Sequence, residues 1–224
     1  MTTRVALKEL RAMGTAQNRK IYGRHGVAGE MYGVSYANLG KLKKKIKVNH
    51  ELARELWATG NHDARVLATM IADPERMKAS TLDAWVRDLD NYVIADAFAG
   101  LVSSTPHTAK RVEKWTGSRD EWAGRAGWHL VARMAMKNEG LPDRYFEEHL
   151  KTIEKEIHGR KNRVRDAMNG AMIAIGLRSA GLEKKAVAIA GRIGKIEVDH
   201  GETGCKTPDA ILYIRQGRAR QKKG

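Results

Sequence analysis

Apolar residues recur at intervals of three and four along almost the whole chain, which is the spacing of one face of an α-helix. Leu52 and Leu56 follow Asn49 in this way, and further apolar positions up to Ile71 follow Asn61. Asparagine is a favoured N-cap residue, so each of these asparagines predicts the start of a helix. No segment shows the alternation of a half-buried strand, and the sequence therefore predicts an all-α protein.

Start and stop signals divide the rest of the chain into further helices with short connections. The predicted starts and ends are Ser80–Asp83, Thr105 with Pro106, Ser118–Glu121 with an end at Gly140, Pro142 with an end at Gly159, and Asn162. Successive helix pairs begin near residues 49, 81, 106 and 142, a spacing typical of an α-solenoid of stacked antiparallel helix pairs. Such a stack has a concave face lined by one helix of each pair. A compact irregular bundle is the structural alternative.

The stretch NYVIADAF, which begins at residue 91, places one carboxylate inside an apolar helical run. At 100° per residue Ile94, Phe98 and Leu101 share one side of the helix, and Asp96 lies opposite them together with Tyr92. Small residues follow on the same side one and two turns later. Asp96 is either an ordinary surface carboxylate or a functional group on a face that a ligand can approach closely.

Two later helices carry polar stripes that contain basic residues and, in one case, an aromatic ring. The stripes consist of Trp122, Arg125, His129 and Arg133 on one helix, and of Lys161, Arg165 and Asn169 on the other. Basic stripes with an interleaved aromatic residue suit contacts to phosphates and sugars. Each stripe taken alone is more often a solvated helix face.

The net charge of the 224-residue chain is +15, and the excess lies towards its two ends. Residues 1–50 carry eleven Lys or Arg against two acids, and residues 151–195 carry eleven against four, whereas residues 51–150 are mildly acidic. Two basic flanks around an acidic middle indicate a polyanion held at both ends. Nucleic acid is the predicted partner, and the basic flanks disfavour a protein-binding solenoid.

Cys205 is the only cysteine, so no disulfide can form within the chain and a reducing compartment is expected. The N-terminal residues lack the apolar region of a signal peptide, and no segment approaches the ~20 apolar residues of a membrane span. The predicted location is the cytoplasm, with no membrane partner.

The segment from residue 198 to residue 214 differs from the helical body. His200 and Cys205 suggest zinc, but two ligands are short of four, and no metal is predicted. Glycines and Pro208 indicate a turn that docks through Ile211 and Ile214, followed by the basic tail RQGRARQKKG, expected to be disordered alone. The predicted organisation is one repeat domain over residues 1–195 and a terminal segment and tail over residues 196–224.

Four stretches resemble the AlkD-like DNA alkylation repair family, which belongs to the HEAT-like repeat DNA glycosylases. They are ELWATGNHDARVLATMIADP, DNYVIADAF, KWTGSRDEWAGRAG and NRVRDAMNGAMIAIG, in the order and spacing of the family over roughly residues 20–180. The resemblance implies a helical solenoid with a concave basic groove for duplex DNA. It also implies excision of N3- or N7-alkylated purines without metal or organic cofactor.

The resemblance also assigns roles to single residues. Tyr92 and Asp96 correspond to the family's aromatic and catalytic carboxylate, although the family usually has Trp where this chain has Tyr. Arg125 matches an arginine that approaches the DNA backbone, and Tyr22 matches an aromatic residue that lines the same cleft. The family's second groove Trp is missing, because Asn169 and its following glycine stand in its place.

A single carboxylate is a sufficient catalyst for this reaction. An N3- or N7-alkylpurine is already cationic and needs no general acid, so Asp96 has only to stabilise the cationic sugar and place a water. The leading prediction is therefore a monomeric, monofunctional DNA glycosylase that hydrolyses the N-glycosidic bond of alkylpurines in duplex DNA. The alternative, favoured by the missing Trp, is a non-catalytic binder of damaged, distorted or branched DNA.

Overall fold

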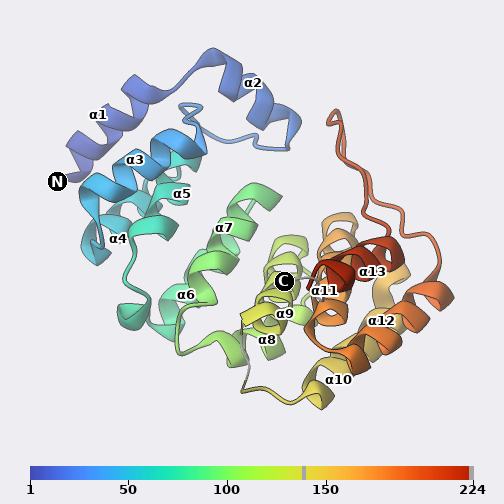
Figure 1. Ribbon diagram of the computed structural model, residues 1–224. Helices are drawn as coiled ribbons and strands as arrows, with labels where there is room; N and C mark the ends of the chain where they lie inside the picture. The colour runs from blue at the N-terminus through green and yellow to red at the C-terminus, as the bar shows by residue number, and fades with distance from the viewer. Residues whose placement is uncertain (138–139, 222–224) are drawn as a thin grey trace. The chain divides into compact units, whose positions relative to one another are not determined.

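The computed structural model describes residues 1–137 and 140–221, and these residues form α-helices and short 3-10 helices without a β-strand (Figure 1). The all-α prediction is confirmed. The chain divides into two compact units. Unit 1 contains residues 1–108 and 201–203, and unit 2 contains residues 109–200 and 204–224. The predicted single repeat domain over residues 1–195, with its terminal segment over 196–224, stays a prediction.

Unit 1 holds the first seven α-helices and two 3-10 helices. They are α1 (Thr3–Met13), α2 (Ala16–Arg24), α3 (Tyr36–Ile46), α4 (His50–Ala58), α5 (His62–Ile71), η1 (Pro74–Arg76), α6 (Ala79–Trp85), η2 (Val86–Asp88) and α7 (Tyr92–Val102).

Helix α5 is the centre of unit 1, since α1, α3, α4 and α7 all pack against it. Trp57 and Trp85 stack with ring centroids 4.1 Å apart, and Phe98 of α7 tilts against Trp57 at 5.9 Å. Burying side chains of this size is worth roughly 1.5–3 kcal/mol each, so this aromatic group is a principal source of the unit's stability.

Unit 2 holds the remaining helices. They are α8 (Thr108–Thr116), whose first residue falls in unit 1, α9 (Glu121–Lys137), α10 (Asp143–Glu156), η3 (Ile157–Gly159), α11 (Asn162–Arg178), α12 (Ala180–Ile193) and α13 (Ala210–Gln221).

Helix α11 is the centre of unit 2 and packs against α9, α10, α12 and α13. The approach of α13 is close because Gly176 of α11 has no side chain. A Cβ atom there would lie 2.7 Å from the Cδ1 atom of Ile214, which is itself fully buried. The last helix is thus fitted to a notch in the central one.

The local signals for helix starts were right at some positions and wrong at others. The side chains of Asn49 and Asn61 accept hydrogen bonds from the third residue after each, as predicted. The box at Ser80 is wrong, because α6 begins at Ala79 without a side-chain cap. Thr105 is wrong as a cap, because α8 begins only at Thr108. Pro142 and Asn162 begin α10 and α11 as expected.

The cap of α9 lies two residues later than predicted. The carboxylate of Asp120, rather than the hydroxyl of Ser118, accepts hydrogen bonds from the backbone N–H groups of Trp122 and Ala123 at 3.1 and 2.8 Å. The helix is described to Lys137, and the predicted end at Gly140 follows two residues that lie outside the described part of the chain. The predicted capping box contains two side-chain oxygen acceptors, Ser118 and Asp120, and the carboxylate of Asp120 caps the helix.

The basic tail is ordered further than predicted. Residues 215–221 continue α13, so the expectation of a disordered tail is wrong for this stretch, and residues 222–224 lie outside the described residues. Arg218 explains part of the order, because it donates to a carboxylate oxygen of Glu183 at 3.1 Å and to the carbonyl of Leu177. Ile214 packs inward as predicted, whereas Ile211 is half-buried.

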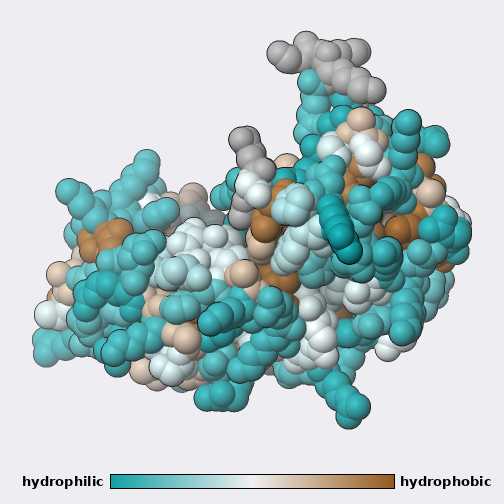
Figure 2. All heavy atoms as spheres, turned by 90° about the horizontal axis from the view of Figure 1, so that it is seen from below, coloured by the Kyte–Doolittle hydropathy of each residue, from teal (hydrophilic) through white to brown (hydrophobic). Residues whose placement is uncertain are grey.

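The surface is mostly hydrophilic on the face seen in Figure 2, where hydrophobic residues stand in small groups among polar ones. Among the described residues, no helix is both long enough and apolar enough to cross a membrane. A surface of this kind, on a chain of net charge +15, suits an anionic partner.

Candidate nucleic-acid interface

Helix α7 presents Asp96 and Tyr92 as the helical wheel predicted. Ile94, Phe98 and Leu101 are buried in unit 1, whereas Asp96 and Tyr92 are half-buried on the other face. Asn91 caps the start of the helix, and its side-chain oxygen accepts a hydrogen bond from the Ile94 N–H at 3.1 Å. Folding therefore places the carboxylate and the phenol on the face of α7 that is not buried in the core.

The ring of Tyr92 is held in place by the end of α2. Its hydroxyl is hydrogen-bonded to the Nδ1 atom of His25, the residue that follows α2. The two rings meet edge to face, with centroids 5.9 Å apart and an interplanar angle of 66°. Nothing in the sequence links these residues, which are separated by 67 positions. His25 was missed for that reason.

A buried carboxylate fixes the loop that joins α2 to α3. Asp63 is 1% exposed, and its oxygens accept hydrogen bonds from three successive N–H groups, those of Tyr32 (2.6 Å), Gly33 (3.0 Å) and Val34 (2.8 Å). Gly33 has a φ of +80°, and a Cβ atom there would lie 2.6 Å from the carbonyl oxygen of Thr15. The loop therefore has one conformation, which only glycine permits at this position.

Tyr22 lies beside this loop, and its hydroxyl is hydrogen-bonded to the loop backbone. The hydroxyl donates a hydrogen bond of 2.6 Å to the carbonyl oxygen of Val34. Burial, followed by the charge of Asp63, raises the pKa of Tyr22, so the phenol stays protonated and remains a donor. The ring also meets His62 edge to face at 5.7 Å. The predicted DNA contact of Tyr22 stays a prediction.

Tyr36, the first residue of α3, completes the group. Burial, followed by the charges of Tyr22, Asp96, Asp63 and Tyr92, raises its pKa to about 12. The ring stays accessible, since 48% of the residue surface is exposed. The site in unit 1 consists of Tyr22, Tyr36, Tyr92, His25, Asp63 and Asp96, which we call the tyrosine–aspartate cluster.

Arg125 is used within unit 2, where it joins α9 to α11. Its residue surface is 4% exposed, and its guanidinium donates to a carboxylate oxygen of Asp166 at 2.8 Å and to the carbonyl oxygen of Arg163 at 3.1 Å. The sequence assigned Arg125 to the DNA backbone, and that role stays a prediction. The observed contacts give it a structural role that the sequence did not indicate.

The other predicted phosphate contacts lie on the same two helices with different exposure. Trp122, His129 and Arg133 of α9 are half-buried, as is Arg165 of α11, whereas Lys161 precedes α11 and is exposed. Their DNA contacts stay predictions, and the guanidinium of Arg165 and the ammonium of Lys161 are placed where an anion can reach them.

Asn169 is fully buried, unlike its neighbours in the predicted stripe. Its side-chain N–H donates a hydrogen bond of 2.9 Å to the carbonyl oxygen of Pro208. Pro208 belongs to residues 194–209, an extended segment between α12 and α13 that we call the C-terminal arm. The arm therefore covers Asn169, the position to which the family resemblance assigns a second groove Trp.

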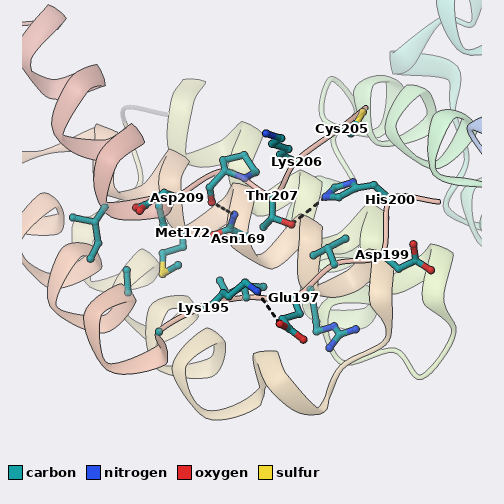
Figure 3. A pocket seen from close by; sticks show the side chains of 18 of the residues that line it. Asn169, Met172, Lys195, Glu197, Asp199, His200, Cys205, Lys206, Thr207 and Asp209 are labelled. Carbon is teal, nitrogen blue, oxygen red and sulfur yellow. Dashed lines mark hydrogen bonds and ion pairs between the residues drawn. The ribbon is translucent and has the colours of Figure 1, made fainter. Parts of the chain in front are cut away.

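The C-terminal arm is anchored to α11 and lines an open pocket beside it (Figure 3). Asn162 and the backbone of Asp199 exchange two hydrogen bonds of 2.7 Å, and the ring of His200 bonds the hydroxyl of Thr207 at 3.0 Å. The pocket has a volume of about 1010 Å³ and is lined by α11, α12 and the arm. Within the described residues, no group of three or more His, Cys, Asp or Glu side chains could hold a metal ion.

Packed helices with half-buried aromatic, acidic and basic side chains on their faces define this chain as an all-α protein with polar helix faces. Residues 6–214 match the family described as "DNA alkylation repair enzyme", and the chain belongs to that family. A solved structure is described as "A new family of proteins related to the HEAT-like repeat DNA glycosylases with affinity for branched DNA structures". That structure is 30% identical, covers 99% of this chain and 95% of its own, and has a TM-score of 0.91. The predicted HEAT-like fold is confirmed, and the concave basic groove stays a prediction.

Two further relatives are uncharacterized proteins from Listeria. Lin0241 of Listeria innocua is 29% identical over 95% of each chain, and Lmo0209 of Listeria monocytogenes is 28% identical over 96% of each chain. The likeness extends over nearly the full length of each protein, and the family match to residue 214 includes the C-terminal arm.

Proposed function

We propose that this protein binds branched or distorted duplex DNA as a non-excising member of its family. The observation that carries the proposal is the burial of Asn169 beneath Pro208. In this chain the arm and a small amide fill the place of an aromatic residue that would contact the damaged nucleotide. The affinity for branched DNA in the description of the 30% identical relative supports the same proposal.

The charge distribution supports a DNA partner with more than one duplex branch. Residues 1–50 lie in unit 1 and residues 151–195 in unit 2, so each unit carries its own excess of basic residues. A branched molecule offers phosphates to both units at once, and the second contact gains from the high effective concentration that the first one creates. We propose that the protein acts as a cytoplasmic monomer without a cofactor.

We predict that a four-way DNA junction binds about tenfold more tightly than a linear duplex of the same sequences, a difference of about 1.4 kcal/mol. Fluorescence anisotropy at several salt concentrations measures both affinities. The logarithm of each binding constant should fall with the logarithm of salt by about 0.9 per phosphate neutralised, and more steeply for the junction.

Equal affinity for junction and duplex would refute the preference for branches but leave DNA binding intact. A binding constant that does not change between low and moderate salt would refute the nucleic-acid partner altogether.

Excision of alkylated purines is the second candidate function, and Asp96 is the observation that favours it. The carboxylate is half-buried next to Tyr92, and a carboxylate in this setting can stabilise a cationic sugar while the charged base departs. If the protein excises bases, we predict that Asp96→Asn lowers the rate of base release about 10²-fold or more, which corresponds to ~3 kcal/mol of transition-state stabilisation. Release of free base from duplex DNA containing N7-methylguanine measures this rate.

Glu75→Gln is the matched control, because Glu75 is exposed in the same unit and the substitution makes the same change of charge. It should leave base release unchanged. Undiminished release by Asp96→Asn would remove this carboxylate from catalysis, and a wild-type protein that releases no base would leave DNA binding as the function.

A further inference from the structure

We propose that the exposed face of α3 is a binding surface for the DNA backbone, continuous with the tyrosine–aspartate cluster. The inference rests on the proposed DNA binding and assigns one strand contact to a specific helix. Its key residues are Tyr36, Gly40, Lys43 and Lys44, which we call the α3 face.

The α3 face follows from how the helix is packed. Leu39 and Leu42 are buried against unit 1, which leaves the other sides of the helix towards solvent. On a wheel of 100° per residue, Gly40 lies one turn after Tyr36, and Lys43 and Lys44 flank the same line one turn later. Tyr36, Lys43 and Lys44 are exposed, and Gly40 is half-exposed.

The two ends of the α3 face differ in chemistry. Burial, and after it the charges of the tyrosine–aspartate cluster, raises the pKa of Tyr36, so its exposed ring carries a protonated phenol that can donate a hydrogen bond. Seven residues later, Lys43 and its neighbour carry two positive charges. At 1.5 Å per residue the separation is about 10 Å, or the rise of about three nucleotides along one strand.

Gly40 leaves the middle of the face open. A Cβ atom built there would meet no other atom within 4 Å, so the absence of a side chain is not required by packing. Glycine in a helix interior is destabilising relative to alanine, and a glycine that the packing does not need suggests that something approaches the backbone here. A sugar–phosphate backbone is a partner that such an opening accommodates.

The lysines of the α3 face remain available for an anion. Within the part of the chain that the structure describes, neither Lys43 nor Lys44 forms an ion pair, whereas Lys45 on another side of α3 pairs with Glu9 at 2.5 Å. Lysines near the C-terminus of a helix also stabilise it through its dipole. If the dipole were the only reason for these lysines, replacing any of them would change the stability of the helix to a similar extent, whichever side of the helix it lies on.

The test compares two double variants that each remove two positive charges from α3. Lys43→Gln with Lys44→Gln alters the α3 face, and Lys41→Gln with Lys45→Gln alters the other exposed sides. For the first variant we expect junction and duplex affinity to fall about tenfold at 0.1 M salt, and the salt slope to fall by nearly 2, since each phosphate contact contributes about 0.9. The second variant should change the slope by less than half of that.

Equal losses in the two variants would overturn the α3 face, because they would reflect net charge alone. Gly40→Gln is a second variant, and it is expected to stay folded. Glutamine is a better helix former than glycine, and its side chain has open space to occupy. We expect an equal or higher Tm and DNA binding weakened about fivefold. Undiminished binding by this variant would likewise overturn the proposal. A wild-type protein that binds no DNA would refute the proposed function itself. The two double variants test only whether the α3 face is the binding surface.

Discussion

Replacing Arg125 with alanine should lower the free energy of unfolding by about 3 kcal/mol. The side chain is 5% exposed and pairs with Asp166, whose side chain is 21% exposed, so the substitution leaves a largely buried carboxylate without its cation. Removing one partner of a buried pair costs about 3–5 kcal/mol, and the partial exposure of Asp166 places this case at the lower end. The carbonyl of Arg163 loses the same donor. Urea denaturation of wild type and variant measures the difference.

Arg133→Ala is the matched control, because it removes the same side chain from a half-buried position on the same helix. It should cost less than about 1 kcal/mol. If Arg125→Ala were instead as stable as the control and bound DNA much more weakly, the arginine would act as the phosphate contact that the family resemblance assigns to it.

Replacing Asp63 with asparagine should cost about 3 kcal/mol as well, through a different loss. The carboxylate accepts three backbone hydrogen bonds, whereas an amide offers one oxygen and turns its own N–H groups towards the remaining donors. Hydrogen bonds to a charged group are worth about 1.5–3 kcal/mol each, and a buried donor left unpaired adds its own penalty. Thermal unfolding measures the loss, and hydrogen exchange of the Tyr32–Val34 amides locates it.

The control for Asp63 is Asp73→Asn, the same chemical change at the start of η1. Its side chain caps the Glu75 N–H at 3.1 Å, and asparagine caps as well as aspartate. We expect a change within about 0.5 kcal/mol. Unaltered exchange of the three amides in Asp63→Asn would mean that the carboxylate does not hold the loop.

The helical fold was predictable because its signals are local. Asn49 and Asn61 each stand before a regular apolar pattern, and both cap helices as expected. The errors occurred where several candidate caps lie side by side. At Ser118 and Asp120 both oxygens are suitable, and Asp120 is the one that caps the helix. Such a choice depends on residues elsewhere in the fold.

The candidate site was predictable only in part, for a related reason. The two faces of α7 follow from a periodicity of 3.6 residues, so Asp96 and Tyr92 were placed correctly relative to the core. The pairing of Arg125 with Asp166 spans 41 residues, and that of Asn169 with Pro208 spans 39. A single sequence carries no signal for such long-range pairs. Arg125 and Asn169, two of the predicted DNA contacts, are buried in unit 2 by these pairings.

The seat of α13 in the notch at Gly176 has a consequence for the order of assembly during synthesis. A chain emerges from the ribosome N-terminus first, and helix α13 emerges after every other helix of unit 2. Until it does, the surface of α11 that receives Ile214 stays bare to solvent and to other nascent chains. Residues 1–108 can meanwhile pack around α5. Translation pauses near the end of the message, and chaperones that bind the chain late in its synthesis, should therefore affect the folding of unit 2 far more than that of unit 1.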